Sequence, residues 1–123
     1  MQNTKSTSPK SGSAAEKSSS EKKSAMQSSQ LMSLFEDALK DIYWAENALL
    51  KAIPKMIKKT TAKELNEALS SHLEETKEQI TRLDKVFTLI KVKAEGKKCD
   101  AMEGLIKEAS DIMDSCEEGS MRD

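Results

Sequence analysis

The sequence predicts an all-α fold. Apolar residues recur every three or four positions along three segments, which is the period of a helix with one buried face. Residues typical of helix starts and ends lie beside these segments. β-branched residues never alternate with polar ones over a useful length, so no segment is typical of a strand.

The first predicted helix runs from about Ser29 to Lys59. Ser28 or Ser29 can cap its start, and lysines near its end suit the negative pole of the helix dipole. Pro54 lies inside the pattern and is expected to kink the helix or end its regular part early, because it lacks a backbone donor. The apolar face consists of Leu31, Leu34, Phe35, Ala38, Leu39, Ile42, Leu49, Ile53, Met56 and Ile57.

The second predicted helix runs from about Ala62 to Lys93. Thr61 and Glu64 have the spacing of a capping box at its start, and Gly96 is well placed to terminate it. The apolar face consists of Leu65, Ala68, Leu69, Leu73, Ile80, Leu83, Val86, Phe87 and Ile90.

The third predicted helix runs from about Ala101 to Glu117. Asp100 and Glu103 give it an acidic start, and Gly119 closes it. The apolar face consists of Met102, Leu105, Ile106, Ala109, Ile112, Met113 and Cys116.

The connection between the first two helices is only a few residues around Thr60. Such short connections favour an antiparallel hairpin. Each long helix would span about 45 Å at 1.5 Å per residue, the length of a four-helix-bundle element. The third helix is about half as long and would lie across or beside the hairpin. Trp44 lies opposite the apolar stripe, where an exposed aromatic residue is typical of an interface.

Residues 1–30 differ in composition from residues 31–123. They contain ten serines and no aromatic residue, which predicts a disordered tail. Residues 31–123 form the predicted helical domain. Five lysines against two glutamates give the tail a charge of +3, which leaves −4 for the domain within a total of −1. The acidic domain argues against nucleic acid binding, apart from weak contact through the basic tail.

Other features restrict the class of protein. No window approaches the roughly 18 apolar residues of a membrane span, and no secretory signal is evident, so we expect no membrane partner. Cys99 and Cys116 match no metal or redox spacing. They suggest a reducing compartment, and we expect a cytoplasmic location without a disulfide. No phosphate-binding loop or nucleophile elbow is present, which argues against nucleotide and hydrolase chemistry.

Glu46 interrupts the apolar stripe of the first helix, where leucine or alanine would be expected. A lone buried carboxylate is costly unless it is paired, hydrogen-bonded or bound to a metal. On the second helix, His72 and Thr76 fall near the centre of the apolar stripe, with Gln79 to one side and Glu75 at the edge. In an antiparallel hairpin Glu46 and Glu75 are equidistant from the turn. Two interruptions of apolar faces are therefore predicted in one layer.

This layer has two interpretations. In the first, His72 hydrogen-bonds Glu46 while Thr76 and Gln79 complete a polar network that only fixes the register of the helices. In the second, Glu46, Glu75 and His72 are half of a carboxylate-bridged dimetal site. Such sites take one glutamate from each of two helices and a glutamate–histidine pair from each of the other two.

At these residues the sequence resembles the YciE/YciF family of bacterial ferritin-like, stress-associated proteins. The resemblance covers about residues 31–123. It rests on the segments LFEDALKDIYWAENALLKAIPKM, HLEETKEQITRLDKVF and CDAMEGLIKEASDIM, and on the closing Arg122-Asp123.

The resemblance implies a ferritin-like four-helix bundle, a dinuclear iron or manganese centre, dimerisation and a role in stress responses. Glu46 would match the first-helix ligand, Glu75 the second-helix carboxylate and His72 a neighbouring ligand. The family usually places glutamate before histidine, whereas His72 precedes Glu75 here. It also continues after Arg122-Asp123 with two further helices that carry the other ligands. We therefore expect a truncated half-bundle that a homodimer could complete, and enzymatic turnover stays undecided.

Overall fold

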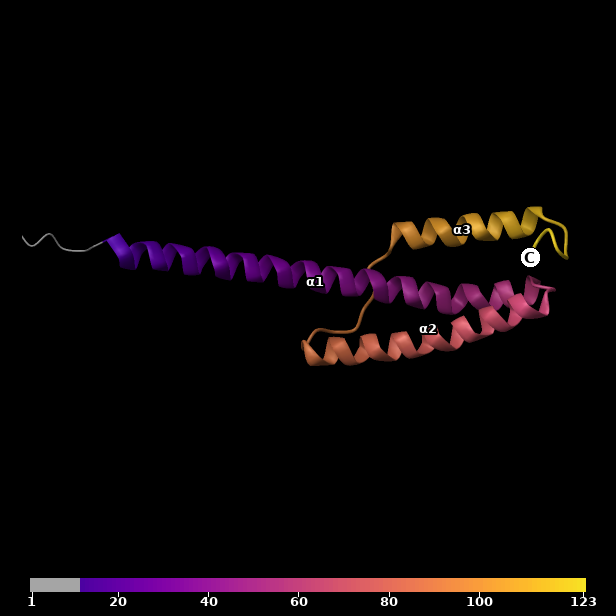
Figure 1. Cartoon of the computed structure of the whole chain (residues 1–123), viewed down its shortest axis with the longest axis horizontal. Helices are drawn as coiled ribbons and strands as arrows, with labels where there is room; N and C mark the ends of the chain where they lie inside the picture. Colours follow the sequence, from indigo (N-terminus) through magenta and orange to yellow (C-terminus); the bar gives the residue numbers. More distant parts are fainter. Residues whose placement is uncertain (1–11) are drawn as a thin grey trace, which may run out of the picture. The chain divides into compact units, whose positions relative to one another are not determined.

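The chain is all-α throughout the part that the structure describes. In this computed structural model the backbone is described for residues 12–123 and the side chains for residues 18–123. The helices are α1 (Gly12–Lys59), α2 (Lys63–Leu89) and α3 (Asp100–Ser115), drawn in Figure 1, and no strand occurs among these residues. The predicted order of two long helices and one shorter helix is confirmed.

Helix α1 begins earlier than the sequence predicts. It starts at Gly12 instead of near Ser29, and it continues through Pro54 to Lys59. Residues 18–35 are all exposed. The low apolar content of the first part of α1 limits how much of it can be buried. It can still be helical, because the hydrogen bonds of an α-helix form within the helix and need no buried partner. The expectation of disorder for residues 1–11 lies outside the described residues.

The described chain divides into two units, Met1–Phe35 and Glu36–Asp123. Only the second contains packed helices. There α1 and α2 form the predicted hairpin through residues 60–62. Near the turn the Asn66 amide donates to the carbonyl of Ile57 at 3.3 Å. Towards the far end of the hairpin, Tyr43 and Phe87 meet edge-to-face with ring centroids 5.4 Å apart. The buried apolar residues are Leu39, Ala52, Ile53 and Phe87.

The start of α2 is capped from a distant part of the chain. The carboxylate of Asp123 accepts hydrogen bonds from the backbone amides of Thr61 at 2.9 Å and Ala62 at 2.8 Å. It also accepts one from the Thr61 hydroxyl at 2.5 Å. The predicted capping box of Thr61 and Glu64 is wrong, because the Thr61 side chain bonds Asp123 and the N-cap residue Ala62 has no side-chain cap.

Helix α2 ends at Leu89, four residues before the predicted end. Lys91 takes a positive φ of 58°, and the Val92 amide donates to the carbonyl of Phe87 at 3.0 Å. Helices commonly end at a residue in the left-handed conformation with this hydrogen-bond pattern, and that residue is usually glycine. The prediction that Gly96 ends α2 is therefore wrong, because Lys91 adopts the conformation that terminates the helix.

The segment between α2 and α3 runs against α1. The Lys97 amide donates to the carbonyl of Lys40 at 3.0 Å. Gly96 lies so close to Trp44 that an added Cβ would be 3.0 Å from the Trp44 Cβ. Trp44 is half-buried, and it contacts another segment of its own chain.

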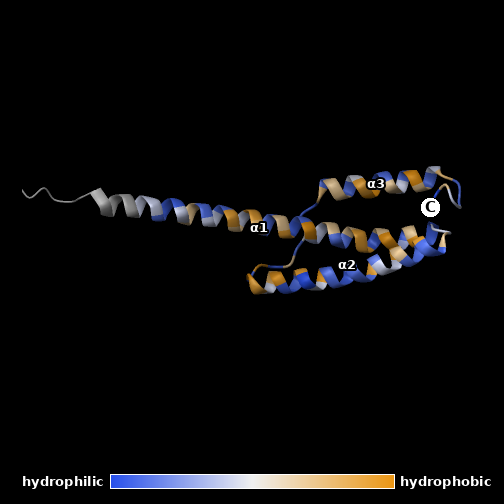
Figure 2. Cartoon of the chain, in the orientation of Figure 1, coloured by the Kyte–Doolittle hydropathy of each residue, from blue (hydrophilic) through white to orange (hydrophobic). Residues whose placement is uncertain are grey.

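Helix α3 lies along α1 on a different side from α2 (Figure 1). The sulfur of Cys99 caps its start by accepting from the Met102 amide at 3.4 Å. Lys59 at the end of α1 pairs with Asp114 near the end of α3. Hydrophobic and hydrophilic residues alternate along all three helices (Figure 2). Within the described residues, none of the helices combines the length and apolar character needed to traverse a bilayer.

Candidate metal centre

Glu46 is half-buried on α1 and faces α2. With the Gln79 amide oriented to suit its neighbours, its nitrogen donates to both carboxylate oxygens of Glu46, at 3.2 and 3.1 Å. Gln79 was predicted to belong to the polar layer, and the structure places it directly on Glu46. A polar side chain of α2 thus contacts the carboxylate that interrupts the apolar stripe of α1.

The surroundings of Glu46 raise the pKa of its carboxyl group. Burial raises the pKa of Glu46 above its usual value, and the nearby charge of His72 opposes this effect only in part. Removal of water from a carboxylate destabilises the charged form unless hydrogen bonds or positive charges replace it. The two bonds from Gln79 and the charge of His72 therefore leave this carboxylate incompletely compensated.

Thr76, one residue along from Glu75, occupies the buried position of the layer. It has no exposed surface, whereas Glu75 is exposed. The break between α1 and α2 spans residues 60–62, so its centre at residue 61 sets Glu46 level with Thr76. Adjacent residues of a helix differ by about 100° in direction, so Thr76 and Glu75 cannot both face α1. The predicted height is confirmed, but the residue that fills it is the threonine.

His72 lies one turn before Thr76 on the same side of α2. Its carbonyl accepts a hydrogen bond from the Thr76 hydroxyl at 2.8 Å. The imidazole is exposed, yet near enough to Glu46 for its charge to act on that carboxylate. The structure therefore brings His72, Thr76 and Gln79 to the side of Glu46.

A single chain does not present a complete metal site. Among the described residues, no three histidine, cysteine, aspartate or glutamate side chains are grouped so that they could hold a metal ion. Glu46 and His72 supply two donors, and Glu75 points elsewhere. The donor set of one chain does not fit a dinuclear centre, which in carboxylate-bridged proteins draws on four helices.

The polar layer extends to a pair that the sequence did not predict. A hydrogen bond with the Asp84 carboxylate raises the pKa of the Tyr43 hydroxyl, and burial adds to this effect. Tyr43 lies one turn before Glu46 on α1, and its ring also packs on Phe87. Tyr43 lies 18 residues before the centre of the turn and Asp84 lies 23 residues after it, so equal distance from the turn would not have found this pair.

Comparison with known proteins identifies the family. A family model described as a domain of unknown function, DUF892, matches residues 30–123. The protein YciF of Escherichia coli K12 is 38% identical over 99 residues, which cover 80% of this chain. The chain belongs to the YciE/YciF family. The sequence resemblance is thereby confirmed.

Solved structures agree with this assignment. The chain superposes on the E. coli stress protein YciF with a TM-score of 0.68 and 39% identity, over 74% of this chain and 58% of that one. It superposes on YcfI from Rhodopseudomonas palustris with a TM-score of 0.67 and 46% identity, over 69% of this chain and 54% of that one. The matched E. coli sequence is covered over 60% of its length. The chain thus spans little more than half the length of these YciE/YciF relatives.

Proposed function

We propose that this protein is a stress-associated, ferritin-like protein that binds two iron or manganese ions between two copies of the chain. Similarity to the E. coli stress protein YciF supports the stress role. The free thiols of Cys99 and Cys116 are consistent with a cytoplasmic location, where thiols stay reduced.

The metal proposal rests on the environment of the Glu46 carboxylate, which is half-buried and incompletely compensated. Burial raises its pKa, and only Gln79 and the charge of His72 compensate it. A bound cation would oppose this rise in pKa, because opposite charge at short range favours the ionised form. Among the residues of this layer, Glu46 is therefore the one whose charged form a bound metal would stabilise most.

A second copy would supply the missing donors. A two-fold dimer has the same patch on both partners, so it would bring together two copies each of Glu46, Glu75 and His72. Four carboxylates and two imidazoles are the donors of a dinuclear carboxylate site. Exposed Glu75 and His72 are accessible for this purpose. When bound, the metals would supply the redox chemistry that such centres perform on oxygen or peroxide.

A second candidate is a non-catalytic dimerisation module. The hydrogen bonds from Gln79 of α2 to both oxygens of Glu46 on α1 favour it. Polar groups that are hydrogen-bonded within a bundle fix register and partner number at some cost in stability. In this candidate Glu46 sets the alignment of α1 and α2 and needs no metal.

Metal content and molecular mass of the full-length protein distinguish the two candidates. The metal proposal expects a dimer that retains iron or manganese in a fixed ratio after dialysis. Glu46→Ala and Glu75→Ala should each remove the metal. Glu108→Ala is the matched control, because Glu108 is an exposed glutamate of α3 away from the layer.

Three results would contradict the metal proposal. One is a monomer, which lacks the second set of donors. Another is a dimer that remains metal-free and melts at the same temperature with or without added iron or manganese, which is the result expected of the dimerisation module. The third is metal retained equally in Glu46→Ala and Glu108→Ala, which would place the ions elsewhere.

A further inference from the structure

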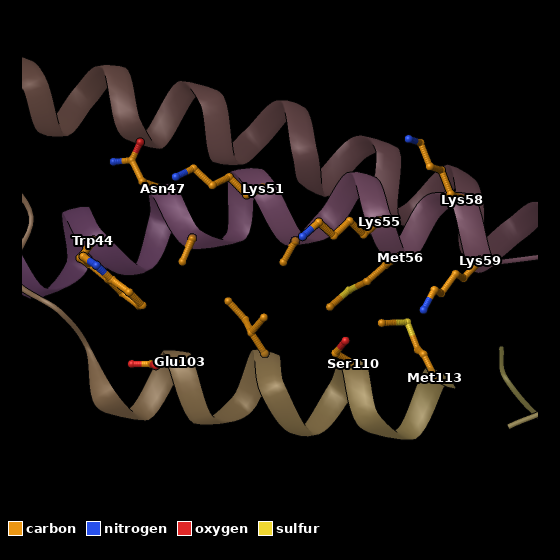
Figure 3. A pocket seen from close by; sticks show the side chains of 13 residues that line it. Trp44, Asn47, Lys51, Lys55, Met56, Lys58, Lys59, Glu103, Ser110 and Met113 are labelled. Carbon is orange, nitrogen blue, oxygen red and sulfur yellow. The ribbon is translucent and has the colours of Figure 1, made fainter. Parts of the chain in front are cut away.

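A cavity of about 560 Å³ lies between α1 and α3, on a different side of α1 from the hairpin partner (Figure 3). Trp44 lies at one end of the cavity, and Met56 and Met113 point towards each other at the other end (Figure 3). Small-molecule sites in proteins have volumes of about 300–1,000 Å³ and mostly apolar walls. The cavity therefore has the size and the wall chemistry of a ligand site.

The cavity exists because the middle of the facing helices carries short side chains. Ala48 and Ala52 line it from α1, and Ser110 lines it from α3. The long side chains of Trp44, Met56 and Met113 lie towards the ends, and Ile106 of α3 also contributes to the lining. The two helices are held at this spacing by the Lys59–Asp114 ion pair and by the segment that joins α2 to α3.

The charge along this cavity is predominantly positive. Lys51, Lys55, Lys58 and Lys59 contribute to its lining, against one acidic residue, Glu103. Glu103 pairs with Lys98 at 2.9 Å, and Lys59 pairs with Asp114. The ion pairs among the described residues include none with Lys51, Lys55 or Lys58. Of these three, Lys55 lies along the wall of the cavity, whereas the side chain of Lys58 points away from α3 (Figure 3).

We propose that this cavity binds a single-chain amphiphile with an anionic head group, of the fatty-acid carboxylate class. The apolar chain lies between Trp44 and the two methionines, and the carboxylate is held by Lys55. Met side chains adapt to apolar ligands of varied shape because they are unbranched and flexible. This binding is independent of the metal centre proposed on the α2 side of α1.

Titration of the full-length protein with sodium dodecanoate tests the proposal. Trp44 is the single tryptophan of the chain and lines the cavity, so its fluorescence reports occupancy directly. We expect a saturable change with dodecanoate below its micelle concentration. Dodecyltrimethylammonium has a similar chain and the opposite charge, and it should bind about tenfold more weakly or not at all.

Matched variants assign the binding to the cavity. Lys55→Gln should weaken dodecanoate binding by about two- to fivefold, since a pair of exposed charges contributes little to the binding free energy. Lys85→Gln, at an exposed lysine of α2, should leave it unchanged. Ser110→Leu fills the middle of the cavity and should abolish binding, with circular dichroism confirming that the helices remain.

Several results would overturn the proposal. They are the absence of a saturable change, equal affinity for the cationic amphiphile, equal weakening by Lys85→Gln, or full binding in folded Ser110→Leu. If Ser110→Leu changes the molecular mass and leaves binding intact, the cavity is instead an interface between copies. Glu46→Gln should bind dodecanoate normally, so a failure of the metal proposal does not affect this one.

Discussion

Replacing Phe87 with alanine is expected to lower the free energy of unfolding by about 3–5 kcal/mol, the usual cost of removing a buried aromatic ring. Phe87 is only 1% exposed and packs edge-to-face on Tyr43 at 5.4 Å. Such aromatic pairs add about 0.5–1.5 kcal/mol beyond the area they bury. The contact also holds α1 and α2 in the register that sets Glu46 beside Gln79.

This loss would be a large part of the total free energy of unfolding. A domain of this size is stable by about 5–15 kcal/mol. A change of 1 kcal/mol shifts the melting temperature of a 60–100-residue domain by about 4–8 °C, so a loss of 3 kcal/mol predicts a fall of roughly 12 °C or more. Urea titration followed by helical circular dichroism measures the change, and Phe87→Leu provides a milder variant if the alanine protein does not fold.

Leu89→Ala is the matched control, because Leu89 lies on the same helix two residues later and is 79% exposed. Its effect should stay within about 0.5 kcal/mol, as is usual for surface positions. Equal losses at Phe87 and Leu89 would refute the packing argument. A double-mutant cycle with Tyr43→Leu should return a coupling of about 0.5–1.5 kcal/mol, and additive effects would refute the contribution of the ring pair.

Three further predictions follow from the contacts and pKa shifts. The free energy of unfolding should fall as pH rises from about 4.5 towards the raised pKa of Glu46, because the folded chain binds that proton more tightly than the unfolded chain. Glu46→Gln should remove this slope in urea titrations, and an unchanged slope would rule out Glu46 as its source. Hydrogen bonds from Thr61 lower the pKa of Asp123, so its stabilising effect should be present at neutral pH and lost as pH falls through that pKa. Asp123→Asn should therefore lower the melting temperature at neutral pH but not in acid, and an equal loss at both would contradict the role of charge. Gly96→Ala should destabilise the fold by about 1 kcal/mol through crowding against Trp44, whereas Gly104→Ala, in open space on α3, should stabilise it by about 0.4–1 kcal/mol, and the same sign for both would contradict the contact.

The helical hairpin and the surroundings of Glu46 could be predicted because both follow from local periodicity. Equal distance from a short turn was enough to bring the right turn of α2 to Glu46. Periodicity also placed Thr76 near the centre of the apolar stripe and Glu75 at its edge, because adjacent residues of a helix differ by about 100° in direction. The structure agrees, since Thr76 is buried and Glu75 is exposed.

The ends of α2 could not be predicted, because their signals are not local. Its cap is Asp123, and its terminator is Lys91, a residue type that rarely adopts positive φ. The close approach of Gly96 to Trp44 likewise depends on how the segment between α2 and α3 crosses α1. Tertiary packing determines both ends of α2 and the position of Gly96, and the propensities of single residues do not describe tertiary packing. The binding of metal by Glu46, Glu75 and His72 stays a prediction.

The cap on α2 also bears on how the chain acquires its structure during synthesis. Asp123 follows Thr61 by 62 residues, so α2 is made long before the carboxylate that caps it. At about 5–20 residues per second, translation leaves the start of α2 without this partner for roughly 3–12 s. During that interval the two backbone amides bond water, and the hairpin relies on its apolar contacts and on the hydrogen bonds between α1 and α2. The cap on the turn forms only when Asp123 emerges, so the connection between α1 and α2 is completed after both α2 and α3 have been made.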